Sequence, residues 1–176
     1  MKANSRLFLL LILLFLFGCT ALPKGIAPVQ PFQIESYLGT WYEIARLDHS
    51  FERGLEQVSA NYSMRDDGGV RVVNRGYSSA SGEWSQAEGK AYFVKSDNQG
   101  HLKVSFFGPF YGAYVVFELG SDYQYAFVSG PNRNYLWLLA RQPEVSDNLK
   151  SKFIRSIQQL GFDDKALIFP RQVSHE

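Results

Sequence analysis

Residues 37–47 read YLGTWYEIARL, and this stretch decides how the rest of the chain is interpreted. Its aromatic and β-branched residues predict a strand over residues 40–47. Similar short runs recur along the chain, separated by turn sequences such as DDGG at residues 66–69. The other predicted strands cover residues 57–64, 70–77, 84–94, 102–107, 113–119, 123–129 and 135–141. This alternation of short strands and turns predicts an all-β domain.

Eight strands joined mainly by short hairpins predict an antiparallel up-and-down barrel, which leaves no edge strand unprotected. A two-sheet sandwich fits the same pattern and stays open as the alternative. One helix is predicted after the last strand, because Ser146 is a suitable N-cap and apolar residues then recur at helical spacing until Gly161, a suitable stop. A single amphipathic helix should pack on the outside of the barrel.

The N-terminus has the features of a secretory signal. Lys2 and Arg6 precede an apolar run at residues 7–17. This run is too short to cross a hydrocarbon core as a helix, which needs about 20 residues. Residues 16–19, Leu-Phe-Gly-Cys, resemble the bacterial lipobox. That resemblance implies that Cys19 becomes the first residue of the mature protein and carries acyl chains that anchor it in a membrane. An ordinary secreted protein with a chance cysteine is the alternative.

These features divide the chain into three parts. We predict a signal peptide at residues 1–18, a lipid-anchored tether at residues 19–31 and a folded domain at residues 32–176. The prolines and glycine of the second part suit an extended tether that holds the domain away from the membrane. Thr20 follows the cysteine. In the Gram-negative lipoproteins that this chain resembles, Asp at this position tends to retain the protein at the inner membrane, so the resemblance implies the outer membrane.

Charge and cysteine content limit the function. Loss of Lys2 and Arg6 with the signal peptide changes the formal net charge from +1 to −1, and the chain has no basic run. We therefore expect no nucleic-acid partner. Once Cys19 is acylated, no thiol remains for a disulfide, a metal site or a nucleophile.

The histidines do not indicate an active site. His49, His101 and His175 lack the spacing of metal ligands, so we predict no metal and no cofactor. Asp48 and His49 are adjacent, and neighbouring residues of a strand point in opposite directions. We therefore interpret this pair as a solvent-exposed part of a barrel mouth and expect no catalytic residues and no enzyme activity.

Three motifs in order now carry a family resemblance. Gly39 and Trp41 form a Gly-x-Trp motif, Ser-Asp-Tyr at residues 121–123 stands where Thr-Asp-Tyr is usual, and Arg141 ends the last strand. With the lipobox, the chain resembles the bacterial outer-membrane lipoproteins of the lipocalin family, which are related to apolipoprotein D. The resemblance implies that Trp41 plugs one closed end of the barrel and that Arg141 lies across its ring as a cation–π pair. Asp122 and Tyr123 are then expected in a loop near that end.

The other end of such a barrel should open onto a cavity. Alternation along the strands gives the candidate lining Tyr62, Met64, Phe106, Phe127, Tyr135, Trp137 and Leu139. Tyr92 and Tyr114 depend on register, because a shift of one residue turns them outward. Arg53, Arg71, Arg75 and Lys103 are the charged candidates for holding a head group. A packed core without a cavity is the alternative.

The resemblance predicts a lipid carrier. We expect a protein anchored in the outer membrane through Cys19 that stores or transports a lysophospholipid or a fatty acid for membrane maintenance under stress. A retinoid- or bilin-like ligand is one alternative. A scaffold protein is another, in which Phe110 and Tyr111 mark a contact surface for a homodimer.

Overall fold

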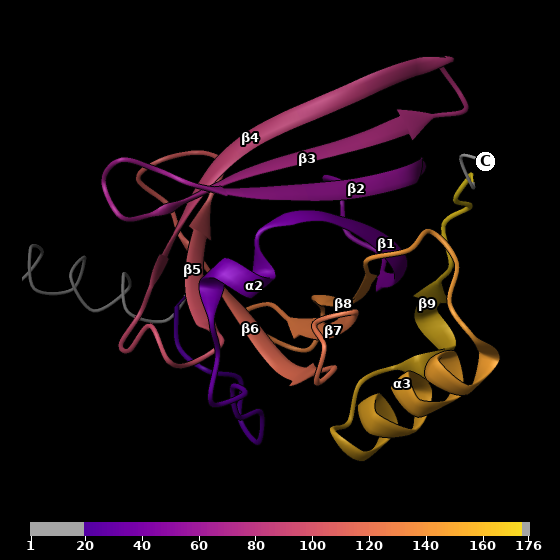
Figure 1. Cartoon of the computed structure of the whole chain (residues 1–176). Coiled ribbons are helices and arrows are strands. Elements are labelled where there is room, and N and C mark those ends of the chain that lie inside the picture. The colour runs from indigo at the N-terminus through magenta and orange to yellow at the C-terminus, as the bar shows by residue number, and fades with distance from the viewer. Residues whose placement is uncertain (1–19, 174–176) are drawn as a thin grey trace, which may run out of the picture.

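The computed structural model describes residues 20–173, which form one antiparallel barrel with a helix on its outside (Figure 1). The predicted signal peptide and Cys19 lie outside the described residues. No helix among residues 20–173 has both the length and the apolar character needed to cross a bilayer. The strands are β1 (Gly39–Leu47), β2 (Leu55–Met64), β3 (Val70–Ser78), β4 (Glu83–Phe93), β5 (His101–Ser105), β6 (Gly112–Leu119), β7 (Tyr125–Ser129), β8 (Leu136–Ala140) and the short β9 (Leu167–Ile168).

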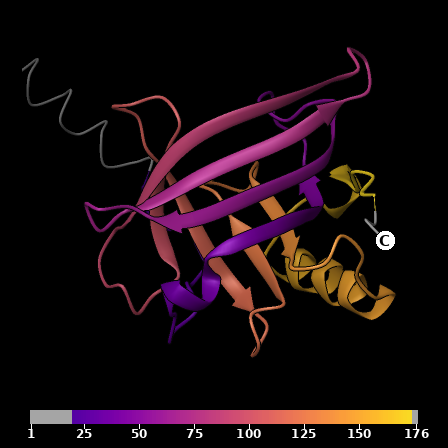
Figure 2. The same cartoon turned by 45° about the horizontal axis from the view of Figure 1, so that its top comes forward.

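The sheet closes on itself. Strands β2 to β8 pair in chain order, β8 pairs with β1, and β1 pairs with β2. Gly39 faces Tyr62 in the last of these pairings, and Tyr42 faces Ala140 on the other side of β1. The predicted eight-stranded up-and-down barrel is confirmed, and the sandwich is excluded. Figure 2 shows the long β2, β3 and β4 curving over the shorter strands.

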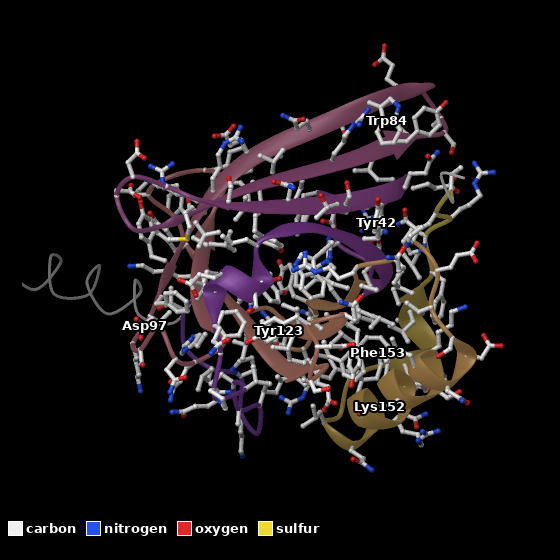
Figure 3. All side chains as sticks on the ribbon, in the orientation of Figure 1. Tyr42, Trp84, Asp97, Tyr123, Lys152 and Phe153 are labelled. Carbon is white, nitrogen blue, oxygen red and sulfur yellow. The ribbon has the colours of Figure 1, made fainter. Side chains whose placement is uncertain are left out.

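Two apolar clusters follow from the alternation along each strand. The inner cluster includes Trp41, Tyr62 and Val128, whereas the outer cluster includes Phe127 and Phe153. The outer cluster is covered by α3 (Asp147–Gln159), whose Phe153 ring centroid lies 4.9 Å from that of Phe127. Figure 3 shows Phe153 on α3. The predicted helix on the outside of the barrel is confirmed.

The ends of α3 agree with the sequence. The Ser146 hydroxyl accepts a hydrogen bond from the Leu149 N–H at 3.3 Å, as an N-cap does. Gly161 follows the helix with φ = +76°, a conformation that favours glycine. The predicted limits of the helix therefore have local physical causes.

Residues 20–31 do not form a free tether. Ile26 is buried in the outer cluster, and Val29 exchanges backbone hydrogen bonds with the barrel at Val116 and Gly100. The Thr20 carbonyl oxygen accepts a hydrogen bond from Nε2 of the buried His101 ring at 3.0 Å. The prediction of an extended spacer was wrong for these residues, because Ile26 packs into the outer cluster, Val29 packs against the inner cluster, and the Val29 backbone bonds to the barrel. We call residues 20–31 the N-terminal strap.

The closed end of the barrel is covered by the short helix α2 (Ile34–Tyr37), which precedes β1. The Trp41 ring is fully buried here, and its indole N–H donates to the Tyr37 carbonyl at 2.8 Å. The Arg141 guanidinium carbon lies 4.0 Å from the Trp41 ring centroid. Tyr37 itself is buried and contacts the ring of Trp41. This end therefore has the geometry expected for a closed barrel floor.

Candidate functional site

A cavity of about 270 Å³ lies inside the barrel above this floor. Ile34 and Tyr37 of α2 line its lower end, and aliphatic side chains from β2 to β6 form most of its wall. Phe51, which is 57% exposed, and Tyr135 line the opposite end. The cavity therefore reaches solvent between the loops that carry these two residues.

Five of the seven predicted lining residues do line the cavity in the structure: Tyr62, Phe106, Tyr135, Trp137 and Leu139. Tyr114, whose orientation depended on register, also lines it. The Tyr92 side chain instead reaches the β2–β3 turn, where its hydroxyl donates to Asp67 at 2.9 Å. A role of the lining residues in ligand binding stays a prediction.

The prediction was wrong for Phe127 and Met64. Ala126 and Val128 occupy the inner positions of β7, so Phe127 points outward under α3. Met64 shares the parity of Tyr62, but β1 begins opposite Tyr62. Met64 therefore lies beyond the end of β1 and is 47% exposed.

Three tyrosine hydroxyls meet near the floor of the cavity. The Tyr114 hydroxyl lies 2.8 Å from that of Tyr37 and 2.9 Å from that of Tyr62. Burial raises the pKa of all three phenols above the usual value, so they are neutral hydrogen-bonding groups. Because they satisfy one another, the floor is polar only in a small region and needs no ligand to complete it.

The family motif at the closed end is held together by Arg141. Its side chain donates to the backbone carbonyls of Thr40, Leu38 and Ser36 at 2.8–2.9 Å, and more weakly to that of Tyr123 at 3.4 Å. Burial lowers the pKa of the guanidinium from its ordinary value but leaves it charged.

Glycine at position 39 has a clear cause. Gly39 has φ = +92°, and a Cβ at this position would lie 3.4 Å from the Arg141 Nη1. A larger residue would therefore strain the backbone and press on the guanidinium.

The loop of Asp122 and Tyr123 supports the same end of the barrel. The Asp122 carboxylate accepts the Gln124 N–H at 3.3 Å, and the Tyr123 hydroxyl accepts the Gln33 N–H at 2.9 Å. Tyr123 takes φ = +56° in this turn. These contacts connect the loop to the chain just before α2.

The most unusual feature of the cavity is a pair of buried carboxyl groups. Glu43 of β1 and Glu52 of the following loop both line the cavity and are 3% and 6% exposed. Arg46 donates to Glu43 Oε1 at 2.6 Å, and the Trp137 indole N–H donates to Glu52 Oε2 at 3.2 Å. A β-bulge between Glu43 and Ala45 lets Glu43 and Arg46 meet on the same side of the strand. Sequence reasoning missed this pair, although Glu43 shares the inward parity of Trp41.

Burial controls the protonation of these carboxyl groups. It raises the pKa of Glu43 well above its usual value, and the neighbouring Glu52 raises it further against the effect of Arg46. The pKa of Glu52 is also raised by burial. Burial, the largest cause for each, therefore shifts the pKa of both carboxyl groups in the direction that favours the protonated form.

His49 is buried rather than exposed, so the sequence interpretation of this residue was wrong. Its ring is stacked on Phe51 with a centroid separation of 4.2 Å, and its Nε2 lies 3.5 Å from Glu52 Oε2. Burial lowers the pKa of the imidazole to about 4, so it is neutral at pH 7. The adjacent Asp48 is exposed, as expected, and accepts a hydrogen bond from Arg53 at 2.7 Å.

None of the predicted head-group cations lines the cavity. Arg53 pairs with Asp48, and Arg71 donates to Glu88 on the outer surface. Arg75 lies over the Trp84 ring, and the Lys103 ammonium lies over that of Tyr111. The four residues therefore have other partners. Among residues 20–173, no cluster of three or more potential metal ligands is present.

The comparisons with known proteins agree with the fold and the motifs. The model of the lipocalin-like domain matches residues 32–172. The outer membrane lipoprotein Blc of Vibrio cholerae is 58% identical over 94% of this chain and 98% of its own length. Bovine apolipoprotein D is 35% identical over 66% of this chain and 65% of its own. Insecticyanin from the tobacco hornworm shares the fold, with a TM-score of 0.69, 19% identity and 87% of each chain covered.

These matches settle the family and the place of the protein. The motif residues Gly39, Trp41 and Arg141 are where the fold needs them, and the relatives match most of the chain. Lipocalins are in general binding and transport proteins, and the apolar cavity suits a small hydrophobic ligand. The chain belongs to the lipocalin family and is a lipoprotein of the bacterial outer membrane.

Proposed function

We propose that this protein stores or carries single-chain lipids, lysophospholipids or fatty acids, at the outer membrane. The observation that carries the proposal is the cavity: it is mainly apolar, closed at one end and open at the other. Its volume of about 270 Å³ is near the lower limit of ligand sites, which is about 300 Å³. One acyl chain suits such a space, whereas a two-chain phospholipid needs a larger one.

The anchor would keep the barrel close to its lipid source. Cys19 directly precedes Thr20, and Thr20 contacts the barrel wall at His101. Acyl chains on Cys19 would therefore hold the barrel at the membrane with little free chain between them. The role in membrane maintenance under stress rests on the family resemblance alone.

A contact surface for a second copy is compatible with lipid binding. Phe107 and Phe110 in the loop between β5 and β6 are 80% and 72% exposed. Tyr111, by contrast, is partly covered by Lys103. Exposed aromatic side chains at the open end support a homodimer, which would extend the mouth of the cavity.

The test is a binding measurement with a blocked cavity. Native mass spectrometry of residues 20–176, followed by lipid extraction, should show a bound single-chain lipid. Titration with lysophospholipid and with fatty acid, followed by tryptophan fluorescence, then gives the affinities. Ala60→Phe places a ring in the cavity and should weaken binding at least about tenfold, or 1.4 kcal/mol.

Ala80→Phe is the matched control, because Ala80 is exposed in the turn between β3 and β4 and does not line the cavity. If both variants bind like the parent, the ligand lies elsewhere and the proposal fails. Visible absorbance of the purified protein would instead favour a retinoid- or bilin-like ligand.

A further inference from the structure

The charges that face the cavity are of one sign. Glu43 and Glu52 line it, and no lysine, arginine or histidine of residues 20–173 does. Both carboxyl groups are on the side of the open end, near Phe51 and Tyr135. A ligand that enters with an anionic group beside them would therefore be repelled.

Arg46 carries a positive charge close to this pair, but it does not make the cavity a site for anions. Its Nη1 donates to Glu43, and its Nη2 donates to the backbone carbonyls of Glu52 and Leu55 at 2.9 and 3.3 Å. The guanidinium is 1% exposed and stands behind the carboxyl groups, not in the cavity wall. One guanidinium thus faces two carboxyl groups, and it donates a side-chain hydrogen bond to Glu43.

The polar groups of this cluster are also incompletely bonded. His49 is more than nine-tenths buried, and neither of its ring nitrogens has a hydrogen-bond partner among residues 20–173. The His49 Nε2 points at Glu52 from 3.5 Å. Buried polar groups are normally satisfied, so this cluster has capacity for a further partner.

Aromatic rings surround the same place. The Trp137 ring centroid lies 5.1 Å from that of His49 and 6.3 Å from that of Tyr135, and Phe51 is stacked on His49. Phe51, Tyr135 and Trp137 all line the cavity. Aromatic faces attract cations, and quaternary ammonium groups in particular.

We propose that Glu43 and Glu52, together with the rings of Phe51, Tyr135 and Trp137, form a subsite for a positively charged nitrogen of the ligand. A protonated amine can donate hydrogen bonds to the carboxylates, and a quaternary ammonium can neutralise them while lying against the rings. In either case the cation offsets the negative charge that Arg46 alone does not balance when both carboxyl groups are ionised. Any phosphate or carboxylate of the ligand then stays toward solvent.

This subsite rests on the proposed lipid-binding function and adds a head-group preference to it. The first test uses the protein of residues 20–176 and three ligands with the same chain: dodecylamine, dodecanol and dodecanoate. We expect the amine to bind at least about tenfold more tightly than the alcohol, a difference of 1.4 kcal/mol, and the carboxylate to bind most weakly. Lysophosphatidylethanolamine should likewise exceed lysophosphatidylglycerol of the same acyl chain.

The second test uses Glu52→Gln. Glutamine can still accept the Trp137 N–H but cannot become negative. The preference for amine over alcohol should fall severalfold, whereas the affinity for dodecanol should not change. Glu83→Gln is the control, because Glu83 is exposed and outside the cavity.

The outcomes separate the two proposals. Equal binding of amine and alcohol by the unmodified protein overturns the cation subsite and leaves the lipid carrier standing. An unchanged preference in Glu52→Gln overturns it as well. If none of these ligands binds, the proposed function itself fails. Should Glu52→Gln not fold, the ligand series on the unmodified protein still decides the question.

Discussion

An arginine and a tryptophan lie near each end of β1, but the arginine at one end has more of its N–H donors satisfied than the arginine at the other. At the start of β1, Arg141 lies over Trp41 and donates to backbone carbonyls of α2, β1 and the Tyr123 loop. Near the end of β1, the Nε of Arg46 has no hydrogen-bond partner among residues 20–173. The two ring nitrogens of His49, three residues further on, also have none within that range. The first arrangement is complete as it stands, whereas the second is not.

This difference separates a structural site from a candidate binding site. A partly buried charge such as that of Arg141, with its donors satisfied, fixes the chain around it, since movement would break several hydrogen bonds. Unsatisfied buried groups cost free energy, and here they lie beside two carboxyl groups that line the cavity and that a ligand can reach. The closed end should therefore govern stability, and the open end should govern ligand choice and the response to pH.

The largest effect should come from Trp41→Ala. The ring is fully buried, and truncation should lower the free energy of unfolding by about 3–5 kcal/mol. Chemical denaturation measures this loss. Trp84→Ala is the matched control, since Trp84 is 47% exposed under Arg75, and it should cost less than about 1 kcal/mol. A Trp41→Ala variant that is as stable as the parent but does not bind lipid would show that the closed end is misplaced.

Arg141→Lys should have the next largest effect. Lysine keeps the charge but cannot reach the carbonyls of Ser36, Leu38 and Thr40 together, so about 2–3 kcal/mol should be lost. Arg75→Lys makes the same change in an exposed arginine that also lies over a tryptophan, 3.9 Å from its centroid. Its effect on thermal unfolding should be under about 0.5 kcal/mol. If the two variants lost similar amounts of stability, the cation–π contact, and not the hydrogen bonds to the three carbonyls, would be the main stabilising interaction of Arg141.

The sequence predicted the closed end better than the open end for a physical reason. The roles of Gly39, Trp41 and Arg141 follow from a motif that the chain shares with the lipocalin family, and the strand and helix limits follow from alternation, turns and caps. Phe127 was misplaced because a shift of one residue turns a side chain through the wall.

The carboxyl pair was harder to find. Glu43 meets Arg46 only because a bulge breaks the alternation of β1, and Glu52 reaches the cavity from a loop. The N-terminal strap was missed because proline and glycine content predicts an extended chain but not the surface on which it lies. Long-range packing of this kind has no local signal in a single sequence.

The smallest of these effects should appear on acidification and belongs to the open end. The pKa of His49 is lowered to about 4 in the folded protein, against 6.5 as its ordinary value. Between these values the unfolded chain binds more protons at this residue, so its contribution to stability is present above pH 6.5 and is lost as the pH falls toward 4. At pH 5 the loss should be about 2 kcal/mol. Arg46, Asp48, Glu52 and Arg53 are the charged or titratable neighbours that face the ring or lie beside it.

His49→Phe isolates this contribution, because phenylalanine keeps the stacking on Phe51 but cannot titrate. Burial raises the pKa of Glu43 and Glu52, which changes stability with pH in the opposite direction, and the variant retains that part. The difference between the two proteins, measured by denaturation from pH 7 to pH 4.5, should therefore narrow or reverse in favour of the variant on acidification. Parallel curves would mean that the pKa of His49 is the same in the folded and the unfolded protein, so that burial does not hold the ring neutral. The pH response that separates the open end from the closed end would then be absent, and the contrast between the two ends would rest on hydrogen bonding alone.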